Sequence, residues 1–258
     1  MLLIGYLYAH FLAGKFSPRA QAIIHSGLLF LSLGWMAWLG KTWASPVLPA
    51  TTSKPDGTEE PLVAILLLLL MSIAIPFLLL SSTSPLIQKW KSFNTGSSSA
   101  STYRLYAISN IGSLLALITY PVLFEPNLTV KIQSHMWTSG YALFAILSVV
   151  TSFQSSKYIR SIRDVPPSSA SPHVAQYALW TGLSACGSLM LVATTNQICR
   201  EVAVVPFLWI LPLAIYLLTF IFSFERKQFY SRGVFHLLLI PVILLAVIVL
   251  SKGVNAPI

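Results

Sequence analysis

The residues best suited to chemistry in this sequence lie along the apolar segment 103–121, YRLYAISNIGSLLALITYP. Wound as a helix at about 100° per residue, the segment places one polar face opposite an apolar one. The polar face consists of Tyr106, Asn110, Ser113 and Tyr120, with Ser109 and Ala116 at its flank. Polar groups in hydrocarbon need partners, so this face must turn away from lipid. These hydroxyl and amide groups suit the lining of a path for a small polar or cationic solute.

The same segment also has the spacing of a helix-packing motif. Ser109, Gly112, Ser113 and Ala116 form small-xxx-small pairs, which allow two helices in a membrane to approach closely. Packing between helices is the simpler interpretation and the one we favour. The two roles can coexist on one helix.

Two further groups of residues are candidates for a site. One is a polar set near the end of the apolar segment 176–197: Thr194, Thr195, Asn196, Arg200 and Glu201. This set can form a gate or a binding rim, although a capped helix end is the simpler interpretation. The segment 203–224 combines two prolines with two aromatic residues, Pro206, Trp209, Pro212 and Tyr216. Prolines kink membrane helices, and such aromatic side chains are more often packing or interface anchors than a ligand cage.

No catalytic or metal-binding pattern accompanies these residues. The sequence contains no glycine-rich phosphate loop, GxSxG or HExxH motif. All 7 acidic residues fall in loops or at segment ends. A pair among the 5 histidines could in principle ligate haem, but nothing fixes their spacing, and Cys186 and Cys199 lack metal-type spacing. We therefore expect no catalytic residue, no metal, no cofactor and no enzymatic activity.

Composition identifies the environment in which these segments must fold. The chain is 55% hydrophobic and 9% charged, with a mean hydropathy of +0.75, whereas soluble domains carry about 25% charged residues. These values predict an all-α polytopic membrane protein with the lipid bilayer as its main partner. The net charge of +9 does not indicate a nucleic-acid partner, because the basic residues cluster in short loops between apolar segments.

Apolar segments of spanning length can be read directly from the sequence. A helix needs roughly 20 apolar residues to cross the bilayer. Seven full spans are expected at about 21–40, 61–82, 102–124, 135–154, 176–197, 203–224 and 232–251, together with a short apolar segment at 1–13. The stretch Pro85–Trp90 reads as a separate short segment at the headgroup level.

Basic residues assign a side to each loop. Alternate loops hold eleven of the 16 Lys and Arg residues: Lys15, Arg19, Lys89, Lys91, Arg104, Lys157, Arg160, Arg163, Arg226, Lys227 and Arg232. By the positive-inside rule these loops are cytoplasmic, which places residue 1 and the C-terminus outside a cytoplasmic membrane. The segment 1–13 would then cover only about 20 Å. We therefore expect either a preceding helix or a partner that completes it.

The proline-containing stretch 155–173 is the best candidate for a boundary. It predicts an N-terminal helix group at 1–154, a cytoplasmic linker at 155–173 and a C-terminal helix group at 174–258.

Four stretches, in this order, resemble a known family: LLIGYLYAHFLAGKFSPRAQAIIH, PFLLLSSTSPLIQKW, YRLYAISNIGSLLALITYPVLFEP and TNQICREVAVVPFLWILPLAIYLLTFIFSF. The chain resembles, from about residue 2 to 224, the major facilitator-like membrane region of bacterial spermidine synthase-like fusion proteins. The resemblance implies a many-helix domain in the inner membrane, a helix before residue 1, and a soluble aminopropyltransferase-like domain that this sequence lacks. No S-adenosylmethionine-type site is therefore carried over. Gln197 and Glu201 depart from the histidine and aspartate expected at these positions.

Two functions remain open from the sequence. The first is a non-catalytic, transporter-like module for a small solute. The second is a structural or accessory subunit of a larger membrane complex, whose partners would be other membrane subunits or a separately encoded soluble domain.

Overall fold

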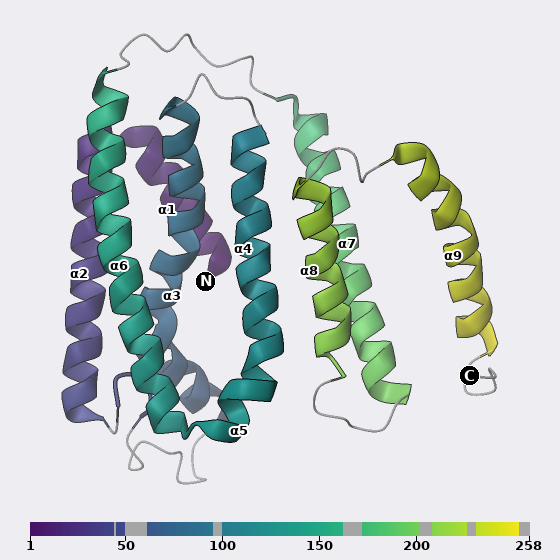
Figure 1. The fold of residues 1–258 in the computed structure, drawn as a ribbon, viewed down its shortest axis with the longest axis horizontal. Helices are drawn as coiled ribbons and strands as arrows, with labels where there is room; N and C mark the ends of the chain where they lie inside the picture. Colours follow the sequence, from purple (N-terminus) through teal and green to yellow (C-terminus); the bar gives the residue numbers. More distant parts are fainter. Residues whose placement is uncertain are drawn as a thin grey trace. The chain divides into compact units, whose positions relative to one another are not determined.

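The structure is a computed structural model that describes residues 1–43, 45–49, 61–94, 100–161, 172–201, 208–225 and 231–252. Within these ranges every regular element is a helix, and Figure 1 shows them along the chain. The predicted all-α class is therefore confirmed. The helices are α1 (Leu2–Lys15), α2 (Pro18–Thr42), α3 (Pro61–Asn94), α4 (Ala100–Thr119), the π-helical turn η2 (Tyr120–Phe124), α5 (Glu125–Asn127), α6 (Val130–Ser161), α7 (Val174–Glu201), α8 (Ile210–Glu225) and α9 (Arg232–Lys252).

Within the described ranges, five helices are long and apolar enough to cross a membrane, which indicates a multi-pass membrane protein. They are Pro18–Thr42, Leu62–Lys91, Arg104–Asn127, Val130–Ser156 and Val174–Cys199. Two shorter apolar helices, Ile210–Phe224 and Gly233–Leu245, lie within the sixth and seventh expected spans. The structure thus supports five of the expected spans, and a total of seven stays a prediction.

The helices form two compact units. Unit 1 comprises Met1–Thr102 and Phe124–Pro167, and unit 2 comprises Tyr103–Leu123 and Ser168–Ile258. Residues 103–123 thus group in space with the C-terminal helices, although α6 separates them in the chain. Most of the expected linker 155–173 lies outside the described residues.

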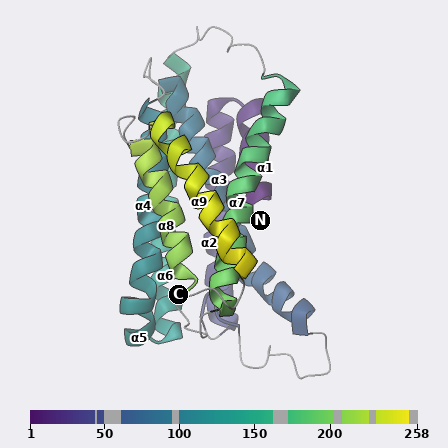
Figure 2. The ribbon, with the colours of Figure 1, turned by 90° about the vertical axis from the view of Figure 1, so that its right-hand side faces the viewer.

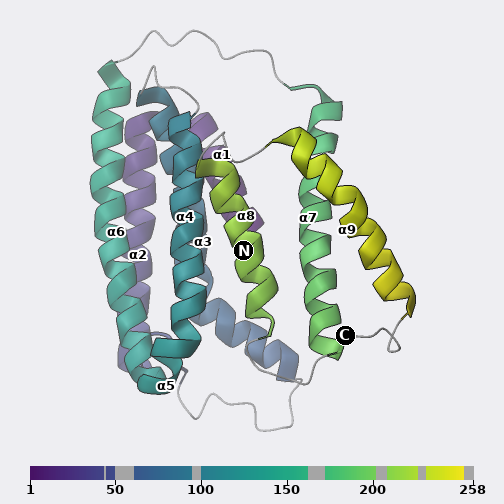
Figure 3. The ribbon, with the colours of Figure 1, turned by 45° about the vertical axis from the view of Figure 1, so that its right-hand side comes forward.

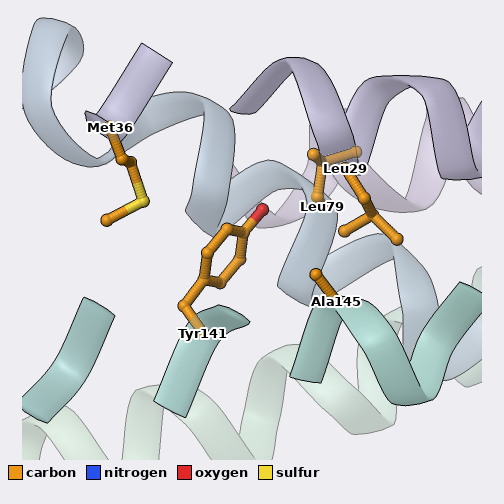
Figure 4. Packing of buried hydrophobic residues seen from close by; sticks show 5 residues of the cluster. All are labelled: Leu29, Met36, Leu79, Tyr141 and Ala145. Atoms are coloured by element: carbon orange, nitrogen blue, oxygen red, sulfur yellow. The ribbon is translucent and has the colours of Figure 1, made fainter. Parts of the chain in front are cut away.

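The core of unit 1 is formed by α2, α3 and α6. One cluster of buried residues there consists of Leu29 and Met36 of α2, Leu79 of α3, and Tyr141 and Ala145 of α6. Figure 4 shows the Tyr141 ring directed away from α6 into this cluster. In hydrocarbon such contacts stabilise a bundle through close packing rather than through release of water.

Hydroxyl groups connect α2 to α6 along their contact. The Ser32 hydroxyl lies 2.6 Å from the Tyr141 hydroxyl, and the Ser26 hydroxyl lies 3.4 Å from that of Ser152. Ser45, which follows α2, lies 2.7 Å from the Ser134 hydroxyl. Hydrogen bonds between membrane helices contribute about 0.6 kcal/mol each on average. The serines of α2 therefore favour α6 as the neighbour of α2.

Helix α1 packs closely beside the C-terminal half of α3. A Cβ at Gly5 would collide with the Ser81 hydroxyl and lie 3.1 Å from the Leu78 carbonyl oxygen. Further along, Leu12 is buried in one cluster with Leu86 and Trp90. Residue numbers increase together on both sides of this contact, so α1 runs parallel to this part of α3.

Helix α3 differs from the sequence expectation at its end. Pro85–Trp90 is not a separate segment, because α3 continues through it to Asn94, and its place at the headgroup level stays a prediction. Trp90 is 3% exposed, and its indole Nε1 donates a hydrogen bond of 2.8 Å to Gln21 Oε1 on α2. Helix α3 bends along its length (Figures 2 and 3), and the buried Pro76 inside it accounts for a bend.

Unit 2 contains α4, α7, α8 and α9. Helix α9 includes Pro241 in its interior, and all of its described side chains are exposed. Figure 3 shows α9 as the yellow helix at the end of the chain. The contact between α7 and α8 provides the groove described below.

Candidate functional site

The candidate site is an open groove between α7 and α8, with a volume of about 660 Å³. Helix α8 contributes one face with helical spacing, made of Tyr216, Thr219, Phe220, Ser223 and Phe224. Helix α7 contributes Leu183, Ser184 and Gly187. The spacing of i, i+3, i+4, i+7 and i+8 brings the α8 residues to one side of the helix.

Small and hydroxylated residues form the polar part of this groove. The Tyr216 hydroxyl lies 3.9 Å from the position that a Cβ at Gly187 would occupy. The Thr219 hydroxyl donates a hydrogen bond of 2.7 Å to the Tyr216 carbonyl oxygen. Ser184 and Ser223 place two more hydroxyl groups along the groove. Each hydroxyl can donate and accept, so the groove can hydrogen-bond a solute of either polarity.

Aromatic rings form a continuous series along the same groove and extend it to α4. The ring centroids of Tyr216 and Phe220 are 4.9 Å apart, and those of Phe220 and Phe224 are 5.8 Å apart. The Phe224 ring then stacks on Tyr106 of α4 at 5.6 Å with an interplanar angle of 29°. These separations are typical of attractive aromatic pairs. Two residues singled out from the sequence, Tyr106 and Tyr216, thus belong to one aromatic series.

The described residues that line the groove carry groups suited to binding. None of these eight is an acid, a histidine, a cysteine or a basic residue. The lining therefore offers no general acid or base that titrates near neutral pH. It offers aromatic faces and hydroxyl groups, which together bind a small solute through its polar groups and its apolar or cationic surface.

The remaining polar residues of α4 bond to their own helix. The Asn110 side-chain amide donates to the Tyr106 carbonyl oxygen at 2.8 Å, and the Ser113 hydroxyl donates to the Ser109 carbonyl oxygen at 3.1 Å. Such bonds to the preceding turn satisfy polar side chains without a second helix. Ser109, Ala116 and Tyr120 are exposed. No described atom lies within 4 Å of a Cβ built at Gly112, so packing through this motif stays a prediction.

The predicted rim residues Thr194, Thr195, Asn196, Arg200 and Glu201 lie on the last turns of α7. The Thr195 hydroxyl donates to the Leu191 carbonyl oxygen at 2.7 Å, while Thr194 and Asn196 are exposed. The side chains of Arg200 and Glu201 lie outside the described residues. A rim or gate formed by this set stays a prediction.

The proline-rich part of the sixth expected span precedes most of α8. Pro206 lies outside the described residues, and Trp209 is exposed in a turn just before the helix. Helix α8 begins at Ile210, which puts Pro212 in its first turn. A proline there sacrifices no helical hydrogen bond, because the first amide groups of a helix have no partner within it. Pro212 therefore marks the start of α8 rather than a bend in its middle.

Sequence reasoning missed most of the groove. Ser184 and Gly187 line it without having been candidates, and four more lining residues lie in the predicted segment 203–224 but were not singled out there: Thr219, Phe220, Ser223 and Phe224. A signal existed in the regular spacing of hydroxyl and aromatic residues from 216 to 224. No comparable signal identified the partner residues on α7.

Unit 1 contains a buried polar cluster around His25, which is fully buried. Its Nε2 lies 3.1 Å from the Thr83 hydroxyl, and its Nδ1 lies 3.3 Å from the Tyr8 hydroxyl. The Tyr8 ring stacks on the imidazole at 6.0 Å. Both ring nitrogens thus have side-chain partners from neighbouring helices. This geometry fits a histidine that ties α1, α2 and α3 together.

Comparison with protein-family models, with curated proteins and with solved structures found no match. The assignment of a function therefore depends on the geometry of the described residues. Among them, the groove between α7 and α8 is the feature whose lining chemistry suits a solute.

Proposed function

We propose that this chain is a non-catalytic, transporter-like membrane module that binds a small solute in the groove between α7 and α8. The observation that carries the proposal is the lining of that groove, which combines four hydroxyl-bearing side chains with a series of stacked aromatic rings. The Thr219 hydroxyl is bonded to its own helix, but hydrocarbon itself offers hydroxyl groups no partners, so a polar solute suits this lining better than lipid does. The proposal agrees with the resemblance to the transporter-like region of spermidine synthase-like proteins.

The length of α8 supports a transport role. Its 16 residues cover about 24 Å, which is shorter than a hydrocarbon core of roughly 30 Å. In secondary transporters, short or proline-interrupted segments are good indicators of the substrate site. Helix α8 is such a short segment, and it lines the groove.

The lining defines the class of solute. The lining residues that the structure describes carry no formal charge, so they select against a strongly anionic solute and offer no counter-charge to a multivalent cation. The faces of Phe220 and Phe224 attract a monovalent organic cation or pack against a planar ring. We therefore expect a small solute with one or two hydrogen-bonding groups on an apolar or cationic body.

Ligand-dependent stabilisation tests this proposal directly. The purified chain is screened for a rise in melting temperature against organic cations, amino acids, nucleosides and polyamines, and hits are then followed by uptake into proteoliposomes. Thr219→Val keeps the shape of the side chain and removes its hydroxyl, and Tyr216→Phe does the same for the ring. Each should weaken binding by roughly fivefold to tenfold, the equivalent of about 1 kcal/mol for one hydrogen bond.

Ser139→Ala is the matched control, because the Ser139 hydroxyl is exposed on α6 and donates to the His135 carbonyl oxygen of its own helix. It should leave binding unchanged. If no solute in the panel stabilises the protein or enters proteoliposomes, the proposal is refuted. It is equally refuted if the groove variants and the control bind a hit alike.

Asn110→Leu separates a solute path on α4 from a packing role. The amide of Asn110 bonds to its own helix, so the substitution should leave folding intact. Lost uptake with normal assembly would place Asn110 on the path. Lost assembly would show that α4 packs against another helix through this residue.

A structural or accessory subunit is the second candidate, and the exposure of α7 favours it. Thr181, Thr194 and Asn196 are exposed on a spanning helix of which 0% of the apolar window is buried. Polar side chains facing hydrocarbon are costly, and a partner helix would relieve that cost. Gentle solubilisation of native membranes distinguishes the two functions, since a protein that runs alone as a monomer contradicts this candidate.

We further propose an inner-membrane location with the basic loops in the cytoplasm and both chain ends outside. Cysteine substitutions in a background without Cys186 and Cys199 test this orientation. Ser17→Cys should resist a membrane-impermeant thiol reagent in intact cells, while Lys131→Cys should react. The reverse labelling pattern would invert the proposed topology.

A further inference from the structure

A second groove, in unit 1, lies between α1 and α3 and has a volume of about 600 Å³. Helix α1 lines it with Tyr6, Ala9, His10, Ala13 and Gly14, and α3 adds Pro85 and Lys89. The α1 residues recur every three or four positions, so they form one stripe along the helix. From Tyr6 to Gly14 this stripe extends for about 12 Å.

The groove is basic at one end and apolar along its walls. Lys89 lies near the C-terminal end of α3, and α1 runs parallel to this part of α3 and ends at Lys15. The imidazole of His10 lies between the two ends of the stripe. None of the described residues that line the groove carries a carboxylate. Arg19 follows close by at the start of α2, so this end of unit 1 has a positive potential.

Small residues keep the groove open. No described atom lies within 4 Å of a Cβ built at Gly14, and Ala9 and Ala13 have no side chain beyond Cβ. The Lys15 ammonium contacts a side chain of its own helix and lies 4.4 Å from the centre of the Phe11 ring. The opening is therefore wide at its basic end and flanked by apolar side chains deeper in.

We propose that this groove binds an anionic phospholipid, with the phosphate beside Lys89 and His10 and an acyl chain along Ala9, Ala13 and Tyr6. Basic pockets between membrane helices on the cytoplasmic side bind anionic headgroups, and the Lys89 end is on the side that the basic loops assign to the cytoplasm. The apolar walls select a lipid over a soluble phosphate, because only a lipid has a chain to fill them. The contact between α1 and α3 would then be stabilised by a lipid seated against both helices.

Lipid-dependent stabilisation tests the site. The purified full chain in neutral detergent is titrated with phosphatidylglycerol, with phosphatidylcholine of the same chain length, and with inorganic phosphate, while the melting temperature is recorded. Phosphatidylglycerol should raise the melting temperature, phosphatidylcholine should do so at higher concentration, and phosphate alone should have no effect. An equal response to the two lipids refutes the proposal, and so does a phosphate response that equals the response to phosphatidylglycerol.

Two variants test whether the lipid binds in this groove. Lys89→Gln should weaken phosphatidylglycerol binding by roughly fivefold, the contribution typical of one basic residue near anionic lipid. Gly14→Leu fills the groove and should weaken both lipids. Lys41→Gln, at the other end of α2, and Gly27→Leu, which also projects into open space, are the matched controls and should bind as the natural sequence does.

Each outcome decides the proposal. Unchanged phosphatidylglycerol binding in Lys89→Gln refutes the phosphate site, and unchanged binding of both lipids in Gly14→Leu refutes this groove as the place where the lipid binds. If one variant fails to fold, the other still tests the groove. These results are independent of solute binding between α7 and α8, which lie in the other unit.

Discussion

The close contact between α1 and α3 predicts that Gly5→Ala destabilises the protein. A Cβ at this position would collide with the Ser81 hydroxyl and lie 3.1 Å from the Leu78 carbonyl oxygen and 3.2 Å from Ser81 Cβ. The hydroxyl can rotate away only by losing its hydrogen bond of 2.9 Å to the Leu78 carbonyl oxygen. The Leu78 oxygen belongs to the backbone and cannot move unless α3 shifts.

The magnitude follows from three terms. Overpacking costs about 1–3 kcal/mol, and loss of the Ser81 hydrogen bond costs about 1 kcal/mol. Alanine recovers about 1 kcal/mol of helix propensity over glycine. We therefore expect Gly5→Ala to destabilise the protein by about 1–3 kcal/mol, which corresponds to a fall in melting temperature of several degrees for a chain of this size.

The assay is thermal or denaturant unfolding of the purified protein in one detergent. Gly34→Ala is the control, because a Cβ there meets no atom within 4 Å and only the helix propensity changes. It should be neutral or stabilising by up to about 1 kcal/mol. Ser81→Ala should reduce the cost of Gly5→Ala, since the colliding hydroxyl is gone. If Gly5→Ala is as benign as Gly34→Ala, the close packing of α1 on α3 is refuted.

Three further substitutions test the hydrogen bonds of unit 1, each measured by unfolding under the same conditions. Tyr141→Phe removes the hydrogen bond of 2.6 Å between α6 and α2 and should cost about 0.6 kcal/mol, with no loss at all contradicting the pairing of these helices. Trp90→Phe leaves the Gln21 oxygen without its indole donor. It should lower the free energy of unfolding by about 1 kcal/mol, with a further loss from packing. An unchanged stability would place the indole in lipid headgroups instead. Thr83→Val leaves the Nε2 of the buried His25 without its partner and should cost about 1–3 kcal/mol, more than Thr83→Ser, which keeps the hydroxyl.

Much of the secondary structure could be predicted from the sequence. The segments 21–40, 135–154 and 176–197 all lie within observed helices, α2, α6 and α7. The prediction succeeded because hydropathy reports a strong physical constraint, namely that a chain in hydrocarbon must satisfy its backbone groups internally. Where the sequence contained a competing signal, as at Pro85 and Trp90, the helix end was misplaced.

The residues of the candidate groove were much less predictable. Tyr216 and Tyr106 were singled out for their place in apolar segments, but their connection through Phe220 and Phe224 joins segments that lie more than a hundred positions apart. Helical spacing tells which residues share a face of one helix. It does not tell which other helix that face meets.

The sequence by itself determined that this is an all-helical membrane protein, where five helices of spanning length lie, and which faces of those helices are polar. These properties depend on local composition and on the helix period. Only the tertiary structure decided that α1 packs parallel to the end of α3, that serines of α2 meet α6, and that α7 and α8 enclose a groove lined by hydroxyl groups and aromatic rings. In lipid every apolar helix surface is equally well solvated, so the choice of neighbour depends on a few close contacts and hydrogen bonds between distant residues.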